Sequence, residues 1–243
     1  MFTLYKKEIS GFFSSLTGYV VIIVFLLLNS LFIWVFKGEM NVLDNSYASL
    51  DTLFALAPWL FLFLVPAITM RMFAEEKRSG TLELLFTRPI REIEIVIAKF
   101  LAAWTLVFIS LIPTLIFFIS ISILGSPPGN IDSGGTWGSY IGLLFLGGIY
   151  TGIGIFTSSL SENQIIAFIL AVLISFLFYL GFNFAGSISQ SGEVVYLIEK
   201  FGIDSHYQSI SRGVIDSRDI IYFFSVIIVF IYLTKTVLQS RKW

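Results

Sequence analysis

The sequence is short of the residues on which most enzyme chemistry depends. It has no cysteine and one histidine among 243 residues, which excludes disulfides, thiolate metal sites and thiol nucleophiles. No Gly-Lys pair occurs, so the chain has no phosphate-binding P-loop. The HExxH and GxSxG patterns are absent as well, and one histidine cannot support the usual hydrolytic sites. We therefore expect a non-catalytic chain with no cofactor or metal of its own.

Charge is also scarce. Charged residues make up 13% of the chain and hydrophobic residues 56%, and the formal net charge is -1. The mean hydropathy is +0.89, which is outside the range of soluble domains. The near-zero net charge leaves no basic face for nucleic acid. These values predict an integral membrane protein.

Long apolar runs predict an all-α fold with six transmembrane helices in a single domain. Each run is close to the roughly 20 residues that a helix needs to cross a bilayer. The runs are 18–36, 53–70, 100–124, 140–160, 164–186 and 220–238. Apart from Lys235, which is close enough to one end to extend to the interface, they contain no Asp, Glu, Lys, Arg or His. A secondary transporter or an ion channel is therefore disfavoured, because both normally place ionisable groups at membrane depth.

The basic residues predict the orientation. If both termini lie inside, eleven of the fifteen Lys and Arg residues lie on the inner side and four on the outer side, which favours N-in and C-in. The first run is too long for a signal peptide and should stay in place. We expect Trp34, Trp104 and Trp137 near the ends of spans, as interfacial anchors.

The segments outside the spans carry further expectations. Residues 3–16 place Tyr5, Ile9, Phe12, Phe13 and Leu16 on one helical stripe, which predicts an interfacial amphipathic helix. Residues 125–139 contain Pro-Pro and Gly-Gly pairs and are predicted to be an outer loop. Residues 187–219 form a long outer segment that we expect to be re-entrant. The lone histidine, His206, lies in that segment and is expected to be solvated.

The fourth run is rich in glycine. Gly138 and Gly142, and also Gly148 and Gly152, are four residues apart, a spacing that lets helices approach closely. The pattern can join two copies of the chain or pack two helices within one copy. We expect internal packing.

A polar stretch separates the second and third runs: RMFAEEKRSGTLELLFTRPIREIEIVIAK, residues 71–99. It holds six of the fifteen basic residues and nearly as many acids. This balance argues against a polybasic lipid anchor and favours docking of another protein.

Local signals predict a short transverse helix inside this stretch. Ser79-Gly80 should end the helix that continues from the second span, and Thr81 can cap a new helix that has Glu83 in its first turn. Pro89 should end it. A charge run is usually a solvated connector, but this helix is more apolar than a connector needs. The expected docking residues are Glu75, Glu76, Arg78, Gly80, Thr81, Leu82, Glu83, Leu84, Leu85, Phe86 and Pro89.

The segment EEKRSGTLELLFTRPIREIEIVIAK, residues 75–99, resembles the signature of ABC-2-type transporter permeases. An amphipathic N-terminal helix, six spans and a re-entrant outer segment before the sixth span follow the order of that family. Three segments are closer still to the gliding-motility-associated ABC permease subunit of Bacteroidetes. They are NSYASLDTLFALAPWLFLFLVPAITMRMFAEEK, GNIDSGGTWGSYIGLLFLGG and SRGVIDSRDIIYF.

The resemblance implies a chain of the bacterial inner membrane that pairs with a second copy. It implies that cytoplasmic ABC ATPase subunits, which bind ATP and Mg, dock on the short inner helix, here Thr81–Phe86 with its flanks. It also implies export of a large amphipathic substrate, and the gliding branch implies a companion membrane subunit with a periplasmic domain. A membrane scaffold that uses the ATPase for assembly or signalling, without cargo, remains the alternative.

Overall fold

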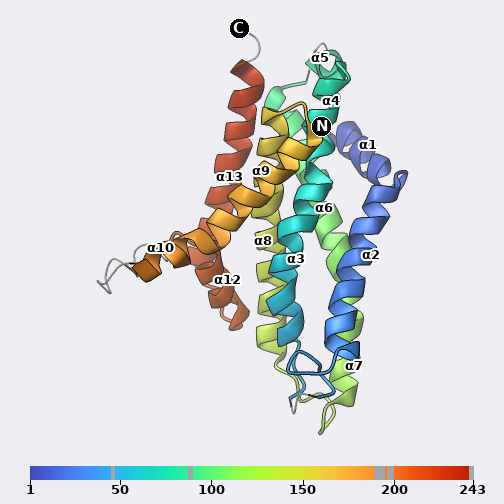
Figure 1. Cartoon of the computed structure of the whole chain (residues 1–243), viewed down its shortest axis with the longest axis vertical. Coiled ribbons are helices and arrows are strands. Elements are labelled where there is room, and N and C mark those ends of the chain that lie inside the picture. The colour runs from blue at the N-terminus through green and yellow to red at the C-terminus, as the bar shows by residue number, and fades with distance from the viewer. Residues whose placement is uncertain (45–46, 87–89, 189–194, 196–199, 241–243) are drawn as a thin grey trace.

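Figure 1 shows the computed structural model of the chain. The structure describes residues 1–44, 47–86, 90–188, 195 and 200–240. For Thr17, Leu84, Phe86, Ser187 and Ile188 it describes the backbone alone. Most of the described residues are helical and none lies in a strand, and six helices are long and apolar enough to cross a membrane. The prediction of an all-α membrane protein with six spans is confirmed.

Helix α1, Phe2–Phe13, is amphipathic and precedes the first span, which consists of α2, Leu16–Ser30, and the π-helical turn η1, Leu31–Val35. Leu4 and Phe12 are buried, and the Tyr5 hydroxyl lies 3.1 Å from Thr105 Oγ1. Leu16 is not part of the apolar stripe of α1, because it begins α2 and is exposed.

The second span is α3, Asp51–Thr69, and the chain continues through α4, Arg71–Arg78, to the short helix α5, Thr81–Phe86. Gly80 has a φ of +69°, which a residue with a Cβ adopts only at a cost. The predicted break at Ser79-Gly80 is confirmed. The N-terminus, the last turn of α13 (Ser217–Ser240) and α5 lie toward one end of the molecule (Figure 1), called here the α5 end, and the opposite end is the α7 end.

The third span starts earlier than hydropathy predicts. It comprises α6, Glu92–Leu111, a 3₁₀ turn, η2, at Ile112–Thr114, and α7, Leu115–Leu124. Pro113 explains the turn, since its ring and missing N–H interrupt an α-helix. Lys99 lies inside this helix and is only 1% exposed. Trp104 lies in the middle of α6, where its Nε1 donates to the Leu144 carbonyl oxygen at 2.8 Å, so its prediction as an interfacial anchor is wrong.

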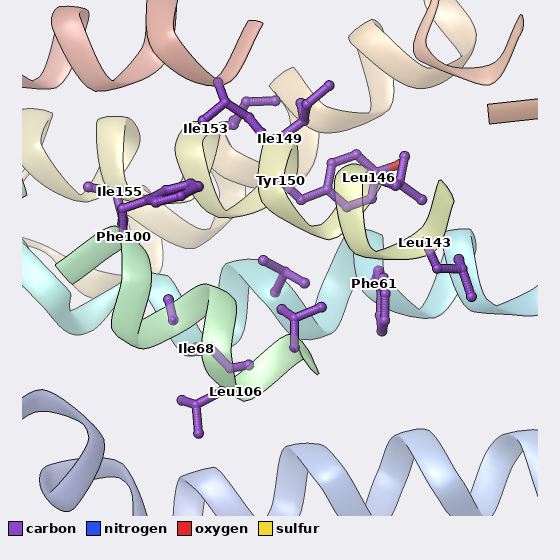
Figure 2. Packing of buried hydrophobic residues seen from close by; sticks show 14 of the residues in the cluster. Phe61, Ile68, Phe100, Leu106, Leu143, Leu146, Ile149, Tyr150, Ile153 and Ile155 are labelled. Carbon is purple, nitrogen blue, oxygen red and sulfur yellow. The ribbon is translucent and has the colours of Figure 1, made fainter. Parts of the chain in front are cut away.

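Helix α8, Ser133–Leu160, lies at the centre of the bundle. Figure 2 shows its buried side chains, among them Leu146 and Tyr150, above Phe61 of α3 and Leu106 of α6. The helix begins seven residues before the predicted span, because Asp132 accepts a hydrogen bond from the Gly135 N–H and caps it. The prediction of a loop throughout residues 125–139 is therefore wrong after Asp132.

The four glycines of the predicted packing pattern all face other helices of the same chain. A Cβ on Gly138 or Gly142 would meet residues 210–213 or Tyr207, and a Cβ on Gly148 or Gly152 would meet Ile227 or Phe230. These neighbours lie in or next to α12, Ile203–Ser211, and in α13, Ser217–Ser240. The absence of side chains on α8 therefore lets α12 and α13 approach its backbone closely.

The fifth span consists of α9, Gln164–Phe176, the π-helical turn η3, Leu177–Gly181, and α10, Phe182–Ile188. In Figure 1, α10 extends away from the bundle and α12 returns to it. Tyr207 of α12 donates to the Phe54 carbonyl oxygen at 2.9 Å, and burial raises the pKa of its phenol. The amphipathic turns predicted at 193–201 lie mostly outside the described residues.

His206 is not solvated as predicted. Its Nδ1 lies 2.6 Å from Asp219 Oδ1, at the start of α13, and its Nε2 lies 2.8 Å from the Lys200 carbonyl oxygen. The ring stacks on Tyr222 at 3.9 Å between centroids. Both ring nitrogens therefore have a hydrogen-bond partner. The contact between His206 and Asp219 thus joins α12 to α13, the last span.

Gly154 offers the clearest test of the packing around α8. A Cβ at this position would overlap the Thr69 side chain at the end of α3. We expect Gly154→Ala to lower the free energy of unfolding by about 1–3 kcal/mol, because a well-packed contact has to shift. The matched control is Gly181→Ala, whose Cβ would meet only Leu177 of its own segment at 3.6 Å. Thermal unfolding in detergent measures both; equal midpoints would contradict the packing account.

Candidate functional site

The residues predicted for docking lie on α4, on the turn after it and on α5. Glu75, Arg78 and Glu83 are exposed. Leu82 is 5% exposed and belongs to the hydrophobic core, and Leu85 is half-buried against the same core. Leu82 and Leu85 thus pack α5 against its own chain. The apolar residues of α5 are therefore weaker evidence for docking of a partner than the sequence indicated.

Three of the predicted docking residues cannot be placed in full. The side chains of Leu84 and Phe86 and all of Pro89 lie outside the described residues. Thr81 is the first residue of α5 rather than the residue before it. Its hydroxyl lies 2.8 Å from Ser79 Oγ and 3.4 Å from the Glu76 carbonyl oxygen. Thr81 therefore joins α5 back to α4 instead of capping α5 as predicted.

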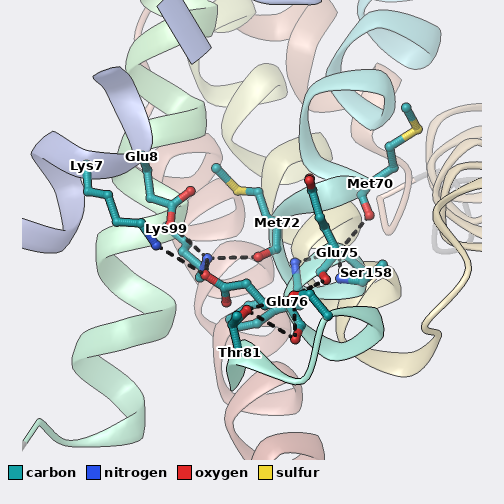
Figure 3. Close-up of polar contacts among 12 residues, drawn as sticks. Lys7, Glu8, Met70, Met72, Glu75, Glu76, Thr81, Lys99 and Ser158 are labelled. Atoms are coloured by element: carbon teal, nitrogen blue, oxygen red, sulfur yellow. Dashed lines mark hydrogen bonds and ion pairs between the residues drawn. The ribbon is translucent and has the colours of Figure 1, made fainter. Parts of the chain in front are cut away.

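A buried lysine joins three helices beneath α5 (Figure 3). Lys99 Nζ lies 2.9 Å from Glu8 Oε1 of α1 and 2.9 Å from Glu76 Oε1 of α4, and it donates to the Met72 carbonyl oxygen at 2.8 Å. Its three N–H groups thus match three acceptors. Lys7 Nζ is 3.8 Å from the same Glu76 oxygen. Two of these partners, Glu8 and Glu76, are carboxylates, and their attraction to the ammonium compensates for the cost of removing it from water.

A serine of α8 fixes the junction between α3 and α4 (Figure 3). Ser158 Oγ donates to the Met70 carbonyl oxygen at 2.8 Å and accepts from the backbone N–H groups of Phe73 and Ala74 at 3.0 and 3.1 Å. A side chain that enters the backbone ladder of a helix in this way interrupts it. Lys77 Nζ donates to the Ser159 carbonyl oxygen nearby. Helix α4 is therefore fastened to the end of α8 at two places.

Together α4 and α5 form an arm. Its helix α4 is joined to α8 through Ser158 and Lys77, and to α6 and α1 through Lys99. The surface that the arm presents includes the exposed side chains of Arg78, Thr81 and Glu83. No cluster of His, Cys, Asp and Glu that could hold a metal occurs among the residues that the structure describes.

Several of these residues were not predicted from the sequence. Glu8 falls on the polar side of the predicted amphipathic helix, which was its only local signal. Lys99 was placed in the inner segment with no expected partner, and its two carboxylate partners are Glu8 and Glu76. Ser158 and Ser159 lie at the end of a glycine-rich span and carry no sequence signal of their role.

A family model described as ABC-2 family transporter protein matches residues 36–198. This range is more than half of the chain and includes α3 to α9 and the arm. The chain belongs to the ABC-2 transporter family. No curated protein matches the sequence.

Membership defines the broad role of the molecule. ABC-2 proteins are the membrane components of ABC transporters, which associate with an ABC ATPase and with membrane lipid. The six apolar helices and the family together indicate a multi-pass membrane protein. In this ABC-2 permease the arm is the candidate functional site.

The lysine network beneath the arm is open to a direct test. Lys99→Met keeps the aliphatic volume but leaves Glu8 and Glu76 facing each other in a buried site. We expect a loss of about 3–5 kcal/mol in the free energy of unfolding, because an ion pair in a buried site has lost one partner. Lys6→Met is the control, since Lys6 is exposed and its ammonium lies over the Phe2 ring. Denaturant titration of the purified proteins measures the difference; similar losses in the two variants would refute the prediction.

Proposed function

We propose that the chain is the permease subunit that couples ATP hydrolysis by a separate ATPase to export of an amphipathic substrate. In this proposal the α5 end faces the cytosol, with both termini inside, in the inner membrane of a bacterium. The bias of basic residues in the sequence supports the orientation, since a six-span topology with both termini inside assigns eleven of the fifteen to inner segments. ATP and Mg bind to the partner, and this chain contributes no catalytic group.

The attachment of the arm to the bundle is the observation that carries the proposal. An ATPase bound to α5 could move the spans only if α5 were rigidly joined to them. Ser158, Lys77 and Lys99 supply that joint on three sides, and all three are buried. A solvated connector would not need a buried ammonium with two carboxylate partners, because loops that only link spans remain exposed.

The proposed cycle uses two copies of the permease. Closure of the paired ATPases displaces both α5 helices, and each arm tilts its bundle, which opens a route for the substrate between or beside the copies. The scarcity of ionisable groups in the spans favours an amphipathic cargo over a small ion. The resemblance of three segments to the gliding-motility branch supports a role in that process, with a companion membrane subunit that carries a periplasmic domain.

A membrane scaffold that uses the ATPase for assembly or signalling is the second candidate function. The apolar interior of the bundle is equally compatible with this role. ATP turnover by the reconstituted complex separates the two candidates. A permease is expected to respond to the lipids or glycans that it moves, whereas a scaffold is expected to be indifferent to them.

Docking on α5 is tested with one charge reversal. Glu83 is exposed in the first turn of α5, and we expect Glu83→Lys to weaken binding of the matching ATPase by about ten-fold or more, since a like charge would replace an attractive one. Vesicles that contain the permease, mixed with the purified ATPase and sedimented, measure the binding. The control is Glu39→Lys, because Glu39 is exposed in the loop at the α7 end. Unchanged recruitment by Glu83→Lys would remove the basis of the docking proposal.

Transmission through the arm is tested separately from docking. Ser158→Ala removes the hydroxyl that accepts two N–H groups and donates to Met70. We expect it to retain ATPase binding but to reduce stimulation of ATP turnover by the permease several-fold, because α4 is no longer fixed to α8. Ser120→Ala is the matched control, since the exposed Ser120 hydroxyl bonds only within its own helix. Full stimulation in Ser158→Ala would contradict the role of this joint.

A further inference from the structure

A cavity of about 430 Å³ lies between α1 and the arm. It is walled by α1 on one side, by α4 on the other and by Lys99 of α6. A second cavity of about 350 Å³ shares Lys7, Glu76 and Thr81 with it and is otherwise lined mainly by apolar side chains. The two cavities are thus adjacent, one polar and one apolar, at the edge of the amphipathic helix α1.

The polar cavity has a balanced charge. Three basic residues and three acidic residues line it: Lys7, Arg71 and Lys99, and Glu8, Glu75 and Glu76. A ligand with a net charge would disturb this balance, whereas a zwitterion would not. The ammonium of Lys99 is already committed to Glu8, Glu76 and Met72, so it is not available to a ligand.

Two groups at the cavity remain available for a ligand. Glu76 Oε2 is buried and has no hydrogen-bond partner among the residues that the structure describes. Arg71 donates to Ser15 Oγ at 3.0 Å and lies over the Phe12 ring. The carboxylates of Glu75 and Glu8 also act electrostatically on it. Its guanidinium has five N–H donors, more than the bond to Ser15 uses, so it can donate to an anion as well. The cavity therefore presents an acceptor that needs a donor, and a planar cation that suits phosphate.

Phosphoethanolamine has both complementary groups. Its primary ammonium can donate to Glu76 Oε2, and its phosphate can accept from Arg71 and from the Ser79 and Thr81 hydroxyls that also line the cavity. A choline group has no N–H to donate to the carboxylate. A headgroup with phosphate but no ammonium would bring negative charge toward Glu75 and Glu76.

We propose that this cavity binds the headgroup of phosphatidylethanolamine. The membrane is the source, rather than soluble phosphoethanolamine, because α1, which forms one wall of the cavity, has the character of an interfacial helix. The bound lipid would bridge α1 and α4 at Arg71 and Glu76. This inference concerns lipid binding alone and does not depend on ATPase docking.

The test measures binding to the purified full chain in detergent. Short-chain phosphatidylethanolamine, phosphatidylcholine and phosphatidylglycerol are added in separate titrations, and soluble phosphoethanolamine in a fourth. Thermal unfolding and native mass spectrometry report the binding. We expect saturable stabilisation by phosphatidylethanolamine at concentrations about ten-fold below those needed for the other two lipids. Equal effects of all three lipids would overturn the proposal, and equal stabilisation by soluble phosphoethanolamine would overturn the membrane source.

Two variants locate the site. Arg71→Gln removes the phosphate donor and Glu76→Gln removes the charge that attracts the ammonium, and each should weaken phosphatidylethanolamine binding by about ten-fold or more. Arg91→Gln is the control, because Arg91 is exposed at the start of α6 and does not line the cavity. Glu76→Gln also removes a charged partner of Lys99 and can therefore prevent folding. If the Glu76→Gln variant does not fold, the test is decided by Arg71→Gln and by the lipid preference of the unmodified chain. Unaltered binding by Arg71→Gln would refute the site.

Discussion

The buried ammonium of Lys99 is the interaction on which the functional end of this permease depends. An isolated charge in such a site would be costly, and the chain compensates by bringing Glu8, Glu76 and the Met72 carbonyl oxygen to it from two other helices. The three acceptors come from α1 and α4. One side chain of the third span thus contacts both the interfacial helix and the arm.

Ser158 complements that charge with neutral hydrogen bonds. Its hydroxyl replaces a backbone acceptor where α3 ends and α4 begins, so the chain turns there without leaving buried N–H groups unpaired. Gly154 lies one turn away on α8 and provides room for the Thr69 side chain. The bend that directs the arm is therefore a property of α3 and α8 together, and neither helix would produce it alone.

Features that depend on local sequence were predictable. Six apolar runs mark six spans because burial in lipid requires length and hydropathy, and Ser79-Gly80 ends α4 because glycine accepts a positive φ. Features that depend on distant neighbours were not. Leu82 looked like a docking residue and is buried in its own chain, Trp104 bonds α8 instead of marking an interface, and His206 pairs with Asp219. None of these partners can be identified from periodicity. The resemblance in residues 75–99 supplied the family, which periodicity alone could not have done.

The central position of α8 has a consequence for assembly. In its most apolar window 78% of the residues are buried, against 22% in the first, fifth and sixth spans. The glycine faces of α8 are already occupied by α12 and α13, so they cannot meet another polypeptide. Any neighbour within the bilayer, whether a second permease or a different subunit, has to contact the peripheral spans, where bulky side chains such as Ile23, Ile169 and Ile228 are exposed. Subunit recognition in the membrane would then depend on the shapes of branched side chains instead of close backbone approach.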